Sequence, residues 1–296
     1  MSAHDDGSFS TQFYRVTYIA KPDGLNSFFS QGAPGKIFEI AGVNSKGVEV
    51  GITVGGTRTY VPAEGINERS FGVTWQIVLL RLMAYANTRD EAVEMLTKGT
   101  PEYRALTGRK TLLRTRNNNW LIADPNGACV VEATAYRYGM RYPGDFGEKN
   151  GGYIGVTNHN MITNSYDRDG NLTTVPMASF GGESSNPGSV TRFYTIQWLG
   201  SLYYGKMDMR MLQEFFSAHY YITKDGQRVD YVWNNTAGWI PAQLFRTLCS
   251  HGGYPEKYSG ATDNDMTAVL GEGLVQFIVG RPCEWQGMRR TYELTQ

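Results

Sequence analysis

The chain has 296 residues, enough for one large domain or two modest ones. Hydrophobic residues make up 41% of it and charged residues 19%, a composition typical of a globular protein that excludes an intrinsically disordered one. Lys plus Arg equals Asp plus Glu at 28 each, and no run of basic residues stands out. We therefore expect neither nucleic acid nor an anionic membrane as a partner.

No segment predicts a membrane span or a secretion signal. The longest apolar stretch, at 73–86, is interrupted by Gln76 and Arg81. Residues 1–7 lack a basic region followed by an apolar one. The three cysteines, Cys129, Cys249 and Cys283, are too few for a disulfide framework and match no zinc signature. No phosphate-binding loop or dinucleotide fingerprint occurs, and we expect no metal and no organic cofactor.

The first part of the chain predicts consecutive antiparallel strands. Strand-forming residues occur at 13–20, 36–41 and 48–54, separated by turn residues at 21–24 and 42–47. A buried helix is expected at 74–86. A second helix follows at 87–96, with Asn87 or Thr88 as its N-cap and acidic residues in its first turn.

The rest of the chain returns from helices to strands. Residues 119–124 and 129–134 predict a hairpin around Pro125-Asn-Gly, and another strand is expected at 152–159. A long loop at 167–187 leads to helical patterns that begin at Ser189 and Met209. The last predicted strands lie at 247–251, 267–270, 274–280 and 289–294. Without repeats or linkers, this order predicts a single α+β domain over 1–296 with helices outside the sheets.

Polar residues gather in Thr157-Asn-His-Asn160, at the end of the predicted strand at 152–159. Successive hydrogen-bonding side chains are costly to bury without partners, which favours a functional site. The amide of Asn158 could donate to a developing oxyanion. It could equally cap a neighbouring turn.

Other candidates are weaker when taken alone. Ser189 resembles a helix cap, and Arg192 follows one turn later as a solvated or a functional arginine. Asp5 and Asp6, preceded by His4, could form a base or metal site or could simply be exposed near a terminus. A second possible pair lies later in the chain. Cys249 and His251 form either a Cys–His nucleophile pair or a core thiol beside a histidine.

Together these segments resemble a known family. The stretch from Asn119 to Thr134, followed by Val156-Thr-Asn-His, is similar to the centre of the acyl-coenzyme A:6-aminopenicillanic acid acyltransferase family. Its relatives include penicillin V acylases and bile salt hydrolases. Further similar motifs follow in the same order: Gly32-Ala-Pro-Gly, Ala41-Gly-Val-Asn-Ser-Lys-Gly-Val, Ser189-Val-Thr-Arg, Leu248-Cys-Ser-His and Gly280-Arg-Pro-Cys.

The resemblance implies a four-layer αββα fold and a nucleophile, normally Cys, that is the first residue of the processed chain. Its own α-amino group serves as the general base in attack on an amide or thioester carbonyl. Asn158 would be the oxyanion donor, and Arg192 with Asp5 or Asp6 would hold the nucleophile region. We expect four residues to contact the substrate: Thr53, which stands where related hydrolases have Asn or Tyr, and Thr157, His159 and Ser189.

In that family the nucleophile opens a strand before the acidic motif, and no such strand is visible before His4. The chain could be the larger product of a longer precursor, with its nucleophile upstream or on a short partner chain. It could be a catalytically inactive relative that binds a ligand. The nucleophile could also have moved, to Ser2 or Cys249. We favour the first hypothesis, an amide-bond hydrolase or acyltransferase acting on an N-acyl small molecule.

Overall fold

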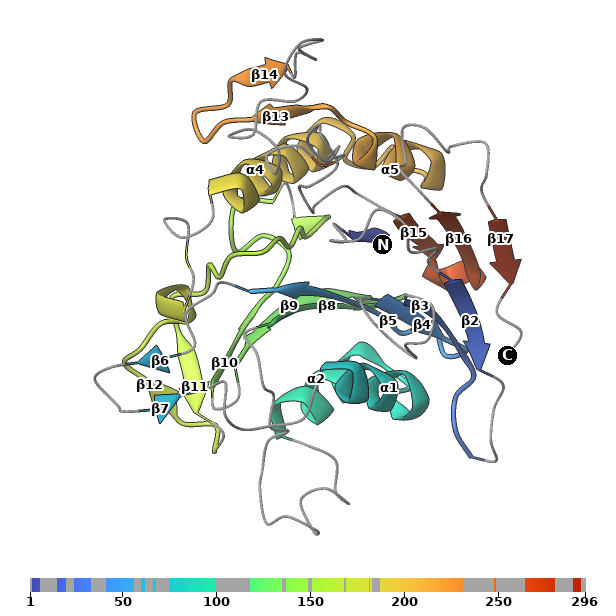
Figure 1. Cartoon of the computed structure of the whole chain (residues 1–296), viewed down its shortest axis with the longest axis horizontal. Helices are drawn as coiled ribbons and strands as arrows, with labels where there is room; N and C mark the ends of the chain where they lie inside the picture. Colours follow the sequence, from blue (N-terminus) through green and yellow to red (C-terminus); the bar gives the residue numbers. More distant parts are fainter. Residues whose placement is uncertain are drawn as a thin grey trace, which may run out of the picture.

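The protein is an α+β structure built around a large antiparallel sheet (Figure 1). This computed structural model describes residues 2–5, 15–19, 24–32, 41–55, 60–61, 66–67, 75–98, 118–134, 137–148, 151–167, 169–180, 182, 187–230, 248, 264–279 and 290–293.

The large sheet has nine strands in the order β12-β11-β10-β9-β8-β5-β4-β3-β2, and all neighbours are antiparallel. Its predicted hairpin is confirmed as β8 and β9, and the strands expected at 13–20 and 48–54 as β2 and β5. The strands are β2 (Arg15–Ile19), β3 (Phe28–Gly32), β4 (Ala41–Asn44), β5 (Glu49–Val54), β8 (Asn118–Asp124), β9 (Gly127–Ala133), β10 (Arg137–Arg141), β11 (Ser165–Asp167) and β12 (Leu172–Thr173).

A second antiparallel sheet joins the two ends of the chain. Its order is β1-β15-β16-β17, and it confirms the last three predicted strands. Two small hairpins stand apart from both sheets, β6 with β7 and β13 with β14. The bounds are β1 (Ser2–Asp5), β15 (Asn264–Val269), β16 (Leu274–Val279), β17 (Arg290–Glu293), β6 (Tyr60–Val61), β7 (Ile66–Asn67), β13 (Tyr220–Ile222) and β14 (Arg228–Asp230).

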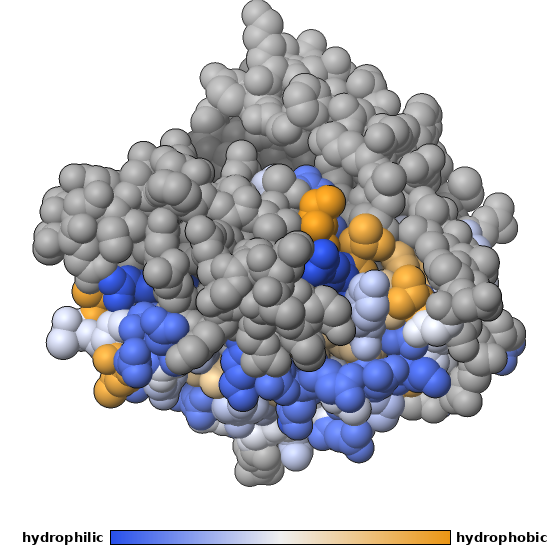
Figure 2. Space-filling view, turned by 90° about the horizontal axis from the view of Figure 1, so that it is seen from below, coloured by the Kyte–Doolittle hydropathy of each residue, from blue (hydrophilic) through white to orange (hydrophobic). Residues whose placement is uncertain are grey.

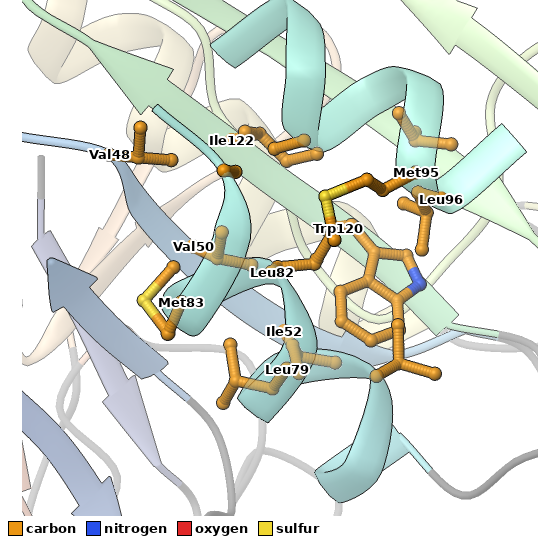
Figure 3. Packing of buried hydrophobic residues seen from close by; sticks show 14 of the residues in the cluster. Val48, Val50, Ile52, Leu79, Leu82, Met83, Met95, Leu96, Trp120 and Ile122 are labelled. Atoms are coloured by element: carbon orange, nitrogen blue, oxygen red, sulfur yellow. The ribbon is translucent and has the colours of Figure 1, made fainter. Parts of the chain in front are cut away.

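Helices α1 (Trp75–Tyr85) and α2 (Arg89–Lys98) cover one face of the large sheet, as Figure 1 shows. Thr88 caps α2, because its hydroxyl accepts the Glu91 N–H at 3.1 Å. Apolar side chains of both helices pack on alternate residues of the central strands (Figure 3). The labelled members of this core are Val48, Val50, Ile52, Leu79, Leu82, Met83, Met95, Leu96, Trp120 and Ile122.

The opposite face of the large sheet packs on the second sheet. Phe29 and Val43 contact Val275 and Tyr292, and the rings of Phe29 and Tyr292 are 5.2 Å apart. Helix α5 (Met209–Phe216) packs on β15 and β1, on the side where Figure 1 also shows α4 (Pro187–Leu202). The two pairs of helices therefore lie on opposite sides of the sheets.

The surface on the side of α1 and α2 is mostly hydrophilic where it is described (Figure 2). This agrees with the composition of α2, which buries Ala92, Met95 and Leu96 while Glu94 and Lys98 are exposed. In the described part of the chain, no helix has the length and apolar character needed to cross a membrane.

The fold corrects two sequence predictions and adds one strand that the sequence did not predict. The turn expected at 42–47 begins only at Ser45, because residues 41–44 pair with β3 and β5. Strand β3 was not predicted, since its aromatic pair Phe28-Phe29 lacks polar alternation. The loop expected at 167–187 contains the short strand β12 and a 3-10 turn, η3 (Met177–Phe180).

Candidate active site

A row of small and polar residues crosses the central strands of the large sheet. Thr53 of β5 lies opposite Asn119 of β8, Asn119 lies opposite Glu132 of β9, and Glu132 lies opposite Gly139 of β10. Their chain neighbours, such as Trp120, belong to the core beneath α1 and α2. Because side chains alternate along a strand, this polar row faces away from those helices.

The segment 151–164 is bound to this row, and it is not the strand that was predicted at 152–159. Thr53 Oγ1 donates to the Thr157 carbonyl at 3.0 Å. The Glu132 carboxylate accepts the N–H groups of Met161 and Ile162 at 2.8 and 3.1 Å. The ladder position beside β9 belongs to β10, so the main chain of the segment is held on the sheet by side chains instead.

Gly139 permits the close approach of this segment. A Cβ at position 139 would lie 2.7 Å from Ile162 Cγ2 and 2.9 Å from the Asn164 carbonyl oxygen. Any larger residue would push the segment away from the sheet.

The structure brings together the two residues predicted to carry the chemistry. Arg192 Nη2 on α4 donates to Asn158 Oδ1 at 2.7 Å. A guanidinium only donates, so the amide oxygen must face it, and the amide NH2 group points to the other side. Arg192 is buried while Asn158 is half-buried. The bond to Arg192 therefore fixes the side-chain amide of a half-buried residue.

Thr157, His159 and Ser189 form a buried cluster that fastens the segment to α4. His159 Nδ1 lies 2.8 Å from Ser189 Oγ and 3.1 Å from Thr157 Oγ1. The Thr157 hydroxyl also donates its hydrogen to the Ser189 carbonyl at 3.1 Å. Substrate contact by these three residues stays a prediction, and each has a structural role.

Ser189 is not the helix cap that was predicted. Helix α4 begins at Pro187, which places Ser189 in its first turn with its hydroxyl directed at His159. Proline suits the first turn of a helix because it has no N–H to leave unpaired.

A buried ion pair holds the start of the segment against α4. Arg141 Nη1 lies 3.4 Å from Glu148 Oε1, and Arg141 Nη2 donates to the Gly155 carbonyl. Glu148 also accepts the main-chain N–H groups of Gly144 and Phe146, each at 3.0 Å, and the amide of Gln197 on α4 at 3.1 Å. Burial lowers the pKa of Arg141, while the nearby carboxylates oppose that effect. The charges of Arg141 and Glu148 are thus removed from water but stabilised by each other and by their hydrogen bonds.

Burial raises the pKa of Glu132 to about 7. The two main-chain N–H donors and the charge of Arg141 act in the opposite direction, because they favour the carboxylate. A carboxyl group under the site therefore changes charge near neutral pH.

The remaining predicted residues are less well placed by the structure. Asp5 ends β1 opposite Asn264, and Ser2 begins the same strand. Asp6, Cys249 and His251 lie outside the described residues. The hydroxyl hydrogen of Thr53 is committed to Thr157, so donation to a substrate would require that bond to break; its substrate role stays a prediction. Across the described ranges, no group of three or more potential ligand side chains could hold a metal ion.

Asn119 and Glu132 were missed as site residues, although both lie in the predicted hairpin. Their position along the two strands is the sequence signal that could have identified them. In strands whose alternate residues are Trp120 and Val131, two polar residues occupy the opposite face.

No protein-family model and no curated protein matches the sequence. Solved structures with a similar arrangement include a mutant of the conjugated bile acid hydrolase from Clostridium perfringens, at 14% identity and a TM-score of 0.47, with 98% of this chain and 91% of the other covered. Another is the penicillin V acylase from Agrobacterium tumefaciens, at 14% identity and a TM-score of 0.40, with 94% and 78% covered. TM-scores below 0.5 at this identity define neither the family nor the activity of the chain.

Proposed function

We propose that this chain is the larger part of an amide-bond hydrolase or acyltransferase that acts on an N-acyl small molecule through an N-terminal nucleophile. In this proposal, residues 1–296 form one domain. The helices and sheets form a four-layer αββα sandwich of the N-terminal-nucleophile type. The motifs around Asn119–Thr134 and Thr157–Asn160 support it, together with the geometry of Asn158.

The bond from Arg192 to Asn158 is the observation that carries the proposal. A donor aimed in advance at the position where negative charge develops stabilises a transition state without reorganising during the reaction. Arg192 fixes the Asn158 oxygen, and the main chain on both sides of Asn158 is bonded to the sheet. Asn158 thus has the rigidity that an oxyanion donor requires.

The proposed reaction proceeds by acyl transfer through the enzyme. The terminal nucleophile attacks the substrate carbonyl and gives its proton to its own α-amino group. The carbonyl oxygen becomes an oxyanion that accepts a hydrogen bond from Asn158. Collapse of this intermediate breaks the C–N bond, and the protonated α-amino group returns its proton to the leaving amine. Water or an acceptor amine then takes the acyl group.

We place the nucleophile on a strand that precedes residue 2 or on a short partner chain. Among the described strands, β1 is hydrogen-bonded to β15 alone, and in this proposal an additional antiparallel strand pairs with its other edge. Asp5, the last residue of β1, would then follow the nucleophile strand as the retained acid.

The nucleophile is tested on the protein isolated from its natural source. Intact mass and N-terminal sequencing would identify a Cys, Ser or Thr generated by processing. We expect this form to release amine from at least one member of a panel of N-acyl amides. Absence of such a terminus together with absence of turnover would contradict the proposal and favour a ligand-binding protein.

The role of Asn158 is tested in the active form. We expect Asn158→Ala to lower kcat by roughly a hundredfold or more, as the loss of one oxyanion donor does. We expect Arg192→Ala to abolish activity. Asn171→Ala provides a matched control, because Asn171 is exposed in the turn between β11 and β12. An unchanged kcat in Asn158→Ala would remove Asn158 from the site.

A further inference from the structure

Asn119 binds the main chain immediately before and immediately after Asn158. Its Nδ2 donates to the carbonyl of Thr157 at 2.8 Å and to the carbonyl of His159 at 3.1 Å. We propose that Asn119 is a positioning residue, which sets the direction of the Asn158 side chain by clamping the chain around it. This inference rests on the proposed function of Asn158 as an oxyanion donor.

The clamp imposes a bend on the main chain. Successive carbonyls of an extended strand point in opposite directions, and those of residues two apart point the same way but are separated along the strand. In this structure the carbonyls of Thr157 and His159 converge on one NH2 group, whose two hydrogens serve the two acceptors. Asn158 lies between the two anchored residues, so its orientation is constrained.

The support beneath Asn119 is rigid. Asn119 is fully buried in the middle of the large sheet, and its neighbours in the polar row hold the same segment. Thr53 shares the Thr157 carbonyl with Asn119, while Glu132 holds the main chain just beyond Asn160. A side chain fixed by packing and hydrogen bonds holds a functional group more accurately than a loop does.

Asn158 is therefore held from two sides. The sheet fixes its main chain through Asn119, and α4 fixes its side-chain oxygen through Arg192. If the clamp is removed, Arg192 still holds the oxygen, but the main chain can shift. The NH2 group then no longer points consistently at one position.

Asn119→Asp and Asn119→Ala test the inference. Aspartate keeps the shape but replaces the NH2 donor by an oxygen that faces two carbonyl oxygens, and alanine removes the donor without adding charge. Asn44→Asp is the matched control. The buried Asn44 also donates through Nδ2 to two main-chain carbonyls, those of Met83 and Ala86, but on the opposite face of the sheet.

Two measurements separate positioning from stability. In protein labelled with 15N-asparagine, the side-chain NH2 resonance of Asn158, assigned with Asn158→Ala, should shift in both Asn119 variants and stay in place in Asn44→Asp. In the active form, kcat should fall about ten- to a hundredfold in the Asn119 variants with KM changed less than about twofold, as expected for a misplaced group.

The outcomes are distinguishable. An Asn158 resonance that does not move in folded Asn119→Ala overturns the inference, whatever the loss of stability. If Asn119→Asp does not fold, the Asn158 resonance in Asn119→Ala alone tests the inference. If the resonance moves while no N-acyl amide is turned over by the wild-type protein, the positioning role stands and the proposed function fails.

Discussion

Glu132 should make the stability of the protein depend on pH between about 4.5 and 7. Burial raises its pKa from the ordinary value of 4.5 to about 7 in the folded protein. In this window the unfolded chain releases the proton while the folded protein keeps it. The free energy of unfolding contributed by Glu132 is therefore fully present below pH 4.5 and is lost as the pH rises to about 7.

The size of the effect follows from the two pKa values. One pH unit between them corresponds to about 1.4 kcal/mol, so the contribution of Glu132 should fall by roughly 3 kcal/mol across the window. The variant Glu132→Gln does not titrate. It also replaces one acceptor of the Met161 and Ile162 N–H groups by an amide NH2, which costs about 1–3 kcal/mol.

Urea denaturation of wild type and Glu132→Gln at pH values from 4.5 to 8 measures this contribution. We expect wild type to be the more stable at pH 4.5 and its advantage to shrink by roughly 3 kcal/mol by pH 8. Because other titrating groups are common to both proteins, the difference between the two curves isolates Glu132. A difference that stays constant, or that grows with pH, would refute the reasoning.

Two further predictions concern buried charge and a buried thiol. Arg141→Ala should destabilise the protein by about 3–5 kcal/mol in urea denaturation, because it leaves the Glu148 carboxylate buried without its ion pair. The control is Arg210→Ala in the exposed pair Arg210–Glu214, which should have no resolvable effect on stability. Burial raises the pKa of Cys129 to about 12. Peptide mapping should therefore find Cys129 unmodified by iodoacetamide at pH 8 in the native protein and modified in urea. Alkylation of Cys129 in the native protein would contradict the described burial.

The elements that the sequence predicted correctly are those with local causes. The hairpin of β8 and β9 follows from two strand-forming stretches around Pro125-Asn-Gly, and α2 follows from Thr88 as a cap with acidic residues in its first turn. These signals lie within a few residues of the structure that they determine. Alternation along β8 and β9 also assigns Asn119 and Glu132 to one face without any tertiary information.

The segment before Asn158 shows where local signals mislead. Apolar and aromatic residues at 153–156 predict a strand, yet the carbonyls of Gly155 and Thr157 accept hydrogen bonds from the side chains of Arg141, Thr53 and Asn119 rather than from a neighbouring strand. One of those partners, Thr53, is 104 residues away from Thr157 in the sequence. Whether a stretch of this kind pairs in a ladder depends on which strand occupies the neighbouring position, and only the fold decides that.

The sequence by itself determined the α+β character, the hairpin that carries the polar row and the identities of Asn158 and Arg192 as candidates. Only the tertiary structure decided that these two residues meet. They are 34 positions apart, and their contact depends on α4 lying beside a segment that is anchored to the sheet. The same packing directs Ser189 to His159 instead of to its own helix end. Hydrogen bonds between distant residues depend on how the layers pack, and periodicity within one element carries no information about that packing.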